Sequence, residues 1–189
     1  MRSLTVIQNE VQSCTKCNLH TTRTNTVFAR GNPQATICIV GEAPGEDEDL
    51  QGFPFVGRSG KLLDRLLQEA GLNVEQDIYV CNVIKCRPPG NRRPSIDEVN
   101  ACIGYLYEQT DIINPKVIVA LGNTAVSNLI PTDLGITKIR GKFFKIGKQL
   151  IMPTYHPSYL LRNGSDDSEP RKQFREDIAA ALDKIKEPT

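Results

Sequence analysis

The sequence predicts an α/β fold, a three-layer α/β/α sandwich around a short, mostly parallel four-stranded sheet. Short β-branched runs alternate along the chain with amphipathic segments, which is typical of a parallel sheet flanked by helices. The length of 189 residues and the 39% hydrophobic content suit a domain with a substantial core. Because no repeat, low-complexity tract or linker interrupts the pattern, we expect residues 1–189 to form a single domain.

Four apolar runs predict the strands of the sheet. They cover residues 35–44, 77–85, 115–122 and 149–157. A fifth run, residues 141–148, is interpreted as one arm of a hairpin that turns at Gly147 and Lys148.

Helices are expected between these strands. Leucines recur at positions 62, 63, 66 and 67, which gives residues 59–70 one apolar face, and Gly71 provides a stop. Residues 95–114 begin with a capping box, in which the hydroxyl of Ser95 accepts from the backbone N–H of Glu98. Residues 123–130 and 169–185 complete the set.

Composition excludes several classes of protein. No run approaches the length of a membrane span, and the beginning of the chain lacks the apolar core of a signal peptide. We therefore expect a cytoplasmic, monomeric protein without a membrane partner, in which disulfides are disfavoured. The net charge of +1 identifies no partner by itself, although basic residues gather in a few segments such as 85–93 and 138–145.

Four cysteines are spaced like ligands of a metal or an iron–sulfur cluster. Two ligands in a Cys-x-x-Cys pair form half of a tetrahedral site, which a remote pair must complete. The four are Cys14, Cys17, Cys86 and Cys102. Cys38 and Cys81 lie in apolar, strand-like runs and are interpreted as small hydrophobic core residues.

The functional residues are expected where the strands end. In an open parallel sheet, the loops after the carboxyl ends of the strands surround a shared crevice. The four predicted strands run into residues 41–45, 82–89, 122–123 and 156–162. We expect these loops to converge on one site, with residues 52–60 forming part of its rim.

These motifs together resemble one family, the iron–sulfur or type-four uracil-DNA glycosylases. The resemblance covers nearly the whole chain, and the motifs are specific in combination rather than singly. They are the four ligand cysteines, GEAPGEDED (41–49), GFPFVGRSG (52–60), the asparagine before Lys-Cys-Arg-Pro-Pro (82–89) and HPSYLLR (156–162).

The resemblance implies removal of uracil from DNA by hydrolysis of the bond to the deoxyribose, which leaves an abasic site. The base must first be extruded from the helix into a pocket, at a cost of a few kcal/mol. Phe55 is expected to stack on the extruded base, and Phe53 to be a packing residue. Gly41, Glu42 and Ala43 are expected to line the same uracil pocket.

Asn82 is expected to select uracil. A side-chain amide can donate to O4 and accept from N3–H, a pattern that cytosine cannot match because its N4 is a donor and its N3 an acceptor. The resemblance places Glu48 near C5 of the base, where it would exclude thymine.

His156 is the leading catalytic candidate. A neutral imidazole that donates to uracil O2 would stabilise the negative charge that develops on the departing base. Related enzymes carry an aspartate where this chain has Ala43, so the base that activates water is missing there. Glu42 and Glu48 are therefore kept as catalytic candidates without a choice between them.

The resemblance also implies contacts with DNA and a cofactor. The expected DNA-binding residues are Arg58, Lys85, Arg87, Ser158 and Arg162. Leu160 or Leu161 could enter the space vacated by the extruded nucleotide, with helix packing as the alternative for one of them. The four cysteines would hold a [4Fe-4S] cluster that ties in the N-terminal segment and orders residues 85–94, with no redox role.

Three other interpretations stay open at this stage. A DNA-crosslinking relative is disfavoured, because VGRSG runs into KLLDRLL with no inserted histidine. A non-catalytic iron–sulfur module that binds DNA or a polymerase would have no need for Asn82, Phe55 and His156 together. A Cys₄ zinc site would change only the metal.

Overall fold

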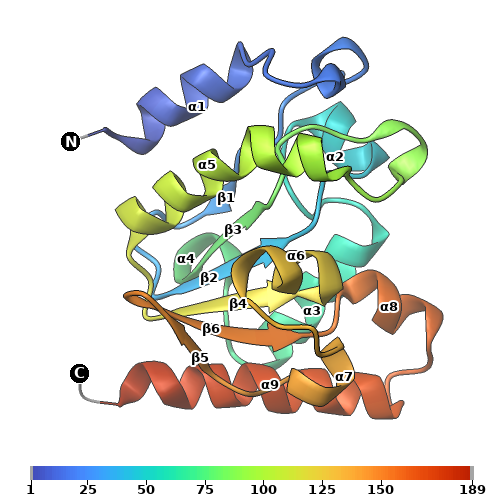
Figure 1. Cartoon of the computed structure of the whole chain (residues 1–189). Coiled ribbons are helices and arrows are strands. Elements are labelled where there is room, and N and C mark those ends of the chain that lie inside the picture. The colour runs from blue at the N-terminus through green and yellow to red at the C-terminus, as the bar shows by residue number, and fades with distance from the viewer. Residues whose placement is uncertain (1, 188–189) are drawn as a thin grey trace.

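A single six-stranded sheet organises the computed structural model, which describes residues 2–187 (Figure 1). The four central strands run parallel, as predicted, and an antiparallel strand lies at each edge. In spatial order the strands are β1 (Arg30–Gly31), β3 (Ile78–Asn82), β2 (Ile37–Gly41), β4 (Val117–Leu121), β6 (Gln149–Thr154) and β5 (Phe144–Ile146). The prediction of four strands is therefore wrong, because β1 and β5 add one strand at each edge of the sheet. Strand β5 is the expected hairpin arm, whereas β1 is too short to carry a sequence pattern.

Helices cover both faces of the sheet. The four helices that the sequence predicts are confirmed as α3, α5, α6 and α9, and Ser95 caps α5 through the expected capping box with Glu98. The helices are α1 (Leu4–Gln12), α2 (Glu46–Gln51), α3 (Arg58–Glu69), α4 (Val74–Asp77), α5 (Ile96–Ile113), α6 (Gly122–Leu129), α7 (Ile136–Ile139), α8 (Pro157–Arg162) and α9 (Glu169–Lys186), with 3₁₀ turns at Asn18–Thr21 and Pro89–Asn91.

Two apolar clusters, one on each face of the sheet, confirm the three-layer arrangement. Side chains alternate along a strand, so Cys38 and Val40 pack under α1, α5 and α6, while Ile37 and Ile39 pack against α3 and α9 (Figure 1). Cys38 and Cys81 are fully buried, which confirms them as core residues. Within residues 2–187, none of the helices combines the length and apolarity needed to cross a bilayer.

Candidate functional site

A groove of about 820 Å³ lies at the carboxyl ends of the four parallel strands. Each of the four predicted strand-end loops contributes to its wall, through residues 42–45, 88 and 91–93, 121–124, and 155, 156, 158, 159 and 162. The expected convergence of the loops is thus confirmed. Ser59, at the start of α3, joins them from the predicted rim.

Asn82 lies deep behind this wall with its amide unpaired. It ends β3 beside Gly41 of β2, and its side chain is 1% exposed. Neither Oδ1 nor Nδ2 has a hydrogen-bond partner within the described residues. Buried polar groups are almost always paired, so an unpaired donor and acceptor on one amide indicate a binding position for a ligand with the complementary pattern.

Gly41 keeps the space in front of Asn82 open. A Cβ at this position would lie 2.4 Å from Asn82 Oδ1 and 2.5 Å from the ring of Phe55. Any larger residue would therefore displace one of the two. The predicted pocket residues Gly41, Phe55 and Asn82 are brought together at one point.

Phe55 is buried and held in a left-handed backbone conformation, with φ 55°. Such a conformation is unfavourable for a bulky residue and is maintained only by its surroundings. Arg30 Nη2 donates to the carbonyl of Phe55 over 3.2 Å on one side, and Glu48 Oε1 accepts from the backbone N–H groups of Val56 and Gly57 on the other, at 2.8 and 2.9 Å. The ring of Phe55 lies 5.8 Å from that of His156. Arg30 and Glu48 thus fix the ring that faces the histidine.

The carboxylate of Glu48 is bound by the loop that carries Phe55. It also accepts from the N–H of Gly45 and does not line the groove. Glu42 and Ala43 do line the groove. Of the two candidate carboxylates, only Glu42 lines the groove, whereas Glu48 lies behind its wall, as Asn82 and Phe55 do.

His156 stands at the start of α8 with a defined proton position. The backbone N–H of Ser158 donates to Nδ1 over 3.1 Å, and the Ser158 hydroxyl lies 2.8 Å from the same nitrogen. The neutral ring then carries its proton on Nε2. Burial and the nearby charge of Arg162 lower the pKa of His156 to about 4, so the ring is neutral at pH 7.

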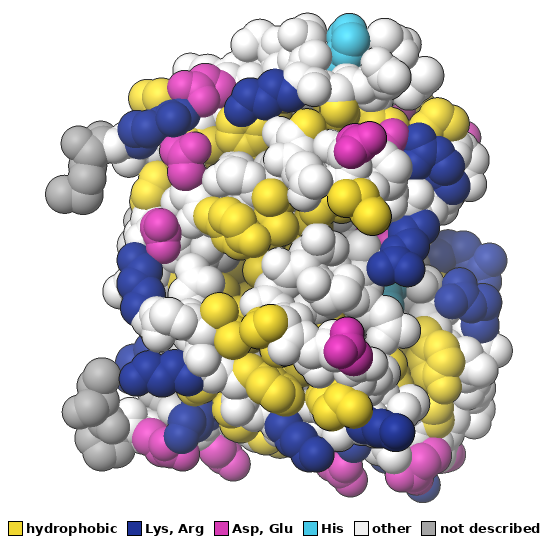
Figure 2. All heavy atoms as spheres, in the orientation of Figure 1, with side chains coloured by type: hydrophobic (Ala, Val, Ile, Leu, Met, Phe, Trp, Pro, Cys, Tyr) yellow, Lys and Arg dark blue, Asp and Glu magenta, His cyan; other side chains and the backbone are white. Residues whose placement is uncertain are grey.

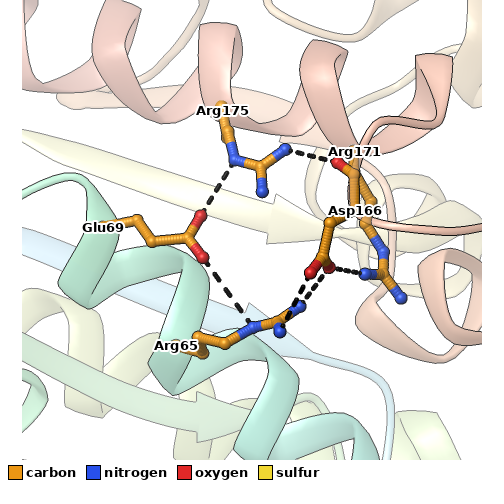
Figure 3. A network of polar contacts seen from close by, with 5 residues as sticks. All are labelled: Arg65, Glu69, Asp166, Arg171 and Arg175. Atoms are coloured by element: carbon orange, nitrogen blue, oxygen red, sulfur yellow. Dashed lines mark hydrogen bonds and ion pairs between the residues drawn. The ribbon is translucent and has the colours of Figure 1, made fainter.

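The segment after α8 is anchored by a charged network that joins it to α3 and α9 (Figure 3). Asp166 accepts from Arg65 and Arg171, and Glu69 pairs with Arg65 and Arg175. The guanidinium of Arg65 holds the pKa of Asp166 below its usual value. Because exposed pairs contribute little singly, the value of the network lies in fixing where α8 ends and α9 begins.

Basic side chains gather beside the groove. Figure 2 shows Lys and Arg along the edge of the molecule where Figure 1 has α2 and α8. Arg162 and Ser158 line the groove, and Arg58 is exposed at the start of α3. Arg87 pairs with Glu46 at 3.5 Å and donates to Asn91, which links α2 to the loop after β3.

Two expectations need correction, and one open alternative is decided. Lys85 is 1% exposed, so it cannot contact a phosphate; the segment after Asn82 turns it inward. Phe53 is 56% exposed and is not a packing residue. Leu160 is fully buried by helix packing. The half-buried Leu161 therefore remains the candidate to fill the space that the extruded nucleotide leaves in the base stack.

Arg93 is a groove residue that sequence reasoning missed. It is exposed and lines the groove, and its side chain makes no ion pair within the described residues. Its neighbour Arg92 is bound to Glu98 over 2.6 Å. The repeated arginines give no sequence signal that separates a paired one from a free one.

The four ligand cysteines meet in one pocket, between the N-terminal segment, the loop after β3 and helix α5. Cys14, Cys17, Cys86 and Cys102 all line it. The backbone N–H of Lys85 donates to the sulfur of Cys102, and Arg23 donates to that of Cys86, both at 3.3 Å. Four thiols in one pocket, two of which receive such donors, fit an iron–sulfur cluster, whose sulfur ligands are typically hydrogen-bonded.

Comparison with known proteins identifies the family of this chain. A family model described as the uracil DNA glycosylase superfamily matches residues 28–182. A Type-4 uracil-DNA glycosylase of Thermotoga maritima is 50% identical over 183 residues, which cover 96% of this chain and 94% of the relative. One of Archaeoglobus fulgidus is 44% identical over 195 residues, with 99% and 94% covered. One of Sulfurisphaera tokodaii is 48% identical over 172 residues, with 86% and 78% covered. The chain therefore belongs to the uracil DNA glycosylase superfamily.

Proposed function

We propose that this protein is a DNA-repair enzyme that extrudes uracil from DNA and hydrolyses its N-glycosidic bond, leaving an abasic site. The observation that carries the proposal is the unpaired, buried amide of Asn82 beside the ring of Phe55, which in turn lies 5.8 Å from the ring of His156. The names of the relatives, which are Type-4 uracil-DNA glycosylases, support the same reaction.

Recognition of the base follows from the chemistry of that amide. Asn82 Nδ2 donates to uracil O4, and Oδ1 accepts from uracil N3–H. Cytosine offers a donor and an acceptor in the reverse order, so it would leave both groups of the buried amide unpaired. An unpaired buried polar group costs about 1–3 kcal/mol, which is enough to reject cytosine by one to two orders of magnitude. Phe55 stacks on the face of the base.

Bond cleavage depends on His156. Its Nε2–H donates to uracil O2, and this hydrogen bond strengthens as negative charge develops on the leaving base. A single preorganised donor of this kind contributes about 3–4 kcal/mol to the transition state. The low pKa of the ring keeps it a neutral donor, which transfers no proton that the reaction would later have to recover.

Attack by water takes place on a sugar that has already gained cationic character. Such a centre needs little activation of the nucleophile, so a carboxylate that orients water is sufficient. We assign this task to Glu42, the groove-lining carboxylate of the first motif. Glu48 acts on the reaction only through the loop that it holds.

The DNA backbone is gripped from the rim of the groove. Arg58 and Arg162 face the region where phosphates flank an extruded nucleotide, and Arg87 extends this surface. Ser158 contributes through its contacts with Nδ1 of His156. Leu161 is assigned to the gap in the base stack.

Cys14, Cys17, Cys86 and Cys102 would hold a [4Fe-4S] cluster, which supplies structural order rather than chemistry. It ties the N-terminal segment to the rest of one glycosylase domain that spans residues 1–189. A zinc ion needs its ligands about 2.3 Å from a single point, whereas a cluster spreads them over several iron atoms. The colour of the purified protein distinguishes the two, because a cluster would absorb visible light and zinc would not.

The test is incubation of the cluster-loaded protein with oligonucleotides that carry one deoxyuridine, followed by alkali cleavage at abasic sites. Single- and double-stranded substrates are compared, and cytosine and thymine at the same position are the controls. Cleavage restricted to the uracil substrates is expected. Binding of these oligonucleotides without cleavage would instead indicate a non-catalytic DNA-binding module.

A further inference from the structure

Lys85 presents an unusual electrostatic problem. It is the largest of the fully buried side chains, and no carboxylate lies within ion-pair distance of it in residues 2–187. Burial of an ammonium group away from water is strongly unfavourable unless an opposite charge is near. A source of negative charge other than an aspartate or glutamate is therefore required.

Its contacts join the two sites described above. The ammonium nitrogen donates to the backbone carbonyl of Asn82 over 2.6 Å. The backbone N–H of the same lysine donates to the sulfur of Cys102 over 3.3 Å, and its carbonyl accepts from Val27 N–H at 2.8 Å. Lys85 also lines the cysteine pocket. Lys85 thus contacts both Asn82, whose side-chain amide is unpaired, and Cys102, one of the four ligand cysteines.

The cysteine site supplies the missing charge. Its ligands bind metal as thiolates, and a cluster held by four thiolates carries a net negative charge. Lys16 and Arg23 also line this pocket, and Arg23 donates to the sulfur of Cys86 and to the carbonyl of Cys14. Lys85 and Arg23 therefore approach the site from different segments of the chain.

We propose that Lys85 is a positioning residue that couples the cysteine site to the base-reading amide. Its ammonium fixes the carbonyl of Asn82 at the point where β3 ends, and hence the direction of the Asn82 side chain. Its charge is balanced by the thiolates of the loaded cysteine site. The inference rests on the glycosylase function proposed above.

The test replaces Lys85 by methionine, which keeps the length of the side chain and removes its charge and donor. The binding of free uracil to the cluster-loaded protein is measured by calorimetry, and we expect it to weaken about tenfold, as for the loss of one hydrogen bond. In the presence of EDTA, the visible absorbance of the cluster should be lost about tenfold faster. Replacing groups that hydrogen-bond to metal ligands typically weakens metal binding by about this factor.

A third measurement separates positioning from DNA contact. The salt dependence of DNA binding reports how many phosphates the protein neutralises. K85M should retain the wild-type slope, because Lys85 is buried. K172M, at an exposed lysine on α9, is the matched control and should behave as wild type in uracil binding and cluster lifetime.

A second variant covers a failure of K85M to fold. K85R keeps the charge, but its wider guanidinium group cannot make the same contact with the Asn82 carbonyl. We expect its cluster lifetime to stay within about twofold of wild type while uracil binding weakens. Wild-type uracil affinity in K85R or K85M, or a shallower salt slope in K85M, would overturn the proposal. A wild-type protein that neither binds nor releases uracil would instead overturn the proposed function. The cluster lifetime of K85M would still test whether the charge of Lys85 is balanced by the thiolates of the cysteine site.

Discussion

The backbone N–H of Ser158 donates a hydrogen bond to Nδ1 of His156. A backbone N–H can only donate, so Nδ1 must present its lone pair and the neutral ring must carry its proton on Nε2. The histidine thus offers a donor to the groove without a positive charge.

The first prediction concerns the pH dependence of His156. Its pKa is lowered to about 4, whereas an ordinary histidine titrates near 6.5. Single-turnover uracil release should therefore show no loss from protonation of this ring between pH about 8 and 5. The measurement is the pH–rate profile, compared between wild type and H156Q. An inflection near pH 6.5 that H156Q removes would contradict the low pKa.

The same shift affects stability. The neutral ring is favoured in the folded state, so its contribution is fully present above the unfolded pKa and is lost as the pH falls from about 6.5 to 4. Chemical denaturation at several pH values should show a steeper fall in the free energy of unfolding for wild type than for H156Q in this window. If the free energy of unfolding depends on pH equally in wild type and H156Q, the pKa of His156 is not lowered in the folded state.

The second prediction concerns catalysis by His156 itself. H156A should reduce single-turnover uracil release by about 10² or more, because the donor to uracil O2 is lost. Folding and the colour of the cluster should be unaffected. Unchanged release with an intact cluster would remove His156 from the mechanism.

The third prediction concerns Asn82. N82D replaces the donor of the amide by a second oxygen, so the contact with uracil O4 is lost. We expect uracil release to fall by about tenfold or more and the preference for uracil over cytosine to narrow. The ratio of release rates on matched oligonucleotides measures this preference, with N100D, at an exposed position of α5, as the control. A variant with the wild-type ratio would refute the assignment of base reading to Asn82.

The fourth prediction separates two adjacent arginines. Arg93 is free to meet a phosphate, whereas Arg92 is held by Glu98, whose pKa it lowers to about 2. R93M should weaken DNA binding and reduce the slope of log affinity against log salt by about one. R92M should change the slope less and instead raise the pKa of Glu98, which can be followed by NMR. Equal salt slopes in the two variants would show that the pairing does not matter for DNA contact.

The sequence predicts the fold wherever a regular pattern persists. The leucines of α3 and the capping box of α5 specify helices locally, and Asn82 and His156 follow apolar strands, so their place at one edge of the sheet is predictable. Lys85 lies beyond Asn82, the last residue of β3. Outside a strand, side chains no longer alternate between the two faces of the sheet, so the sequence pattern does not predict that Lys85 is buried. The two residues of β1 are too few for any pattern.

The position of Glu48 could not be inferred for a related reason. Its acidic neighbours and its place in a short motif suggest a catalytic carboxylate, and the resemblance directs it to the base. Its partners are instead the backbone N–H groups of Val56 and Gly57, whose position depends on how residues 52–57 turn. That turn includes the left-handed Phe55, which no local propensity favours.

The last prediction tests the role of Glu48 as support for Phe55. E48A removes the acceptor of three backbone N–H groups, so the loop loses the bonds that hold Phe55 in its left-handed conformation. Uracil release should fall by about tenfold or more, because the stacking ring is no longer fixed. Since both carboxylate oxygens are engaged by backbone N–H groups, thymine should remain uncleaved. D183N, at an exposed position of α9, serves as the control. Release of thymine by E48A would instead place the carboxylate against C5 of the base, as the resemblance to the family implied.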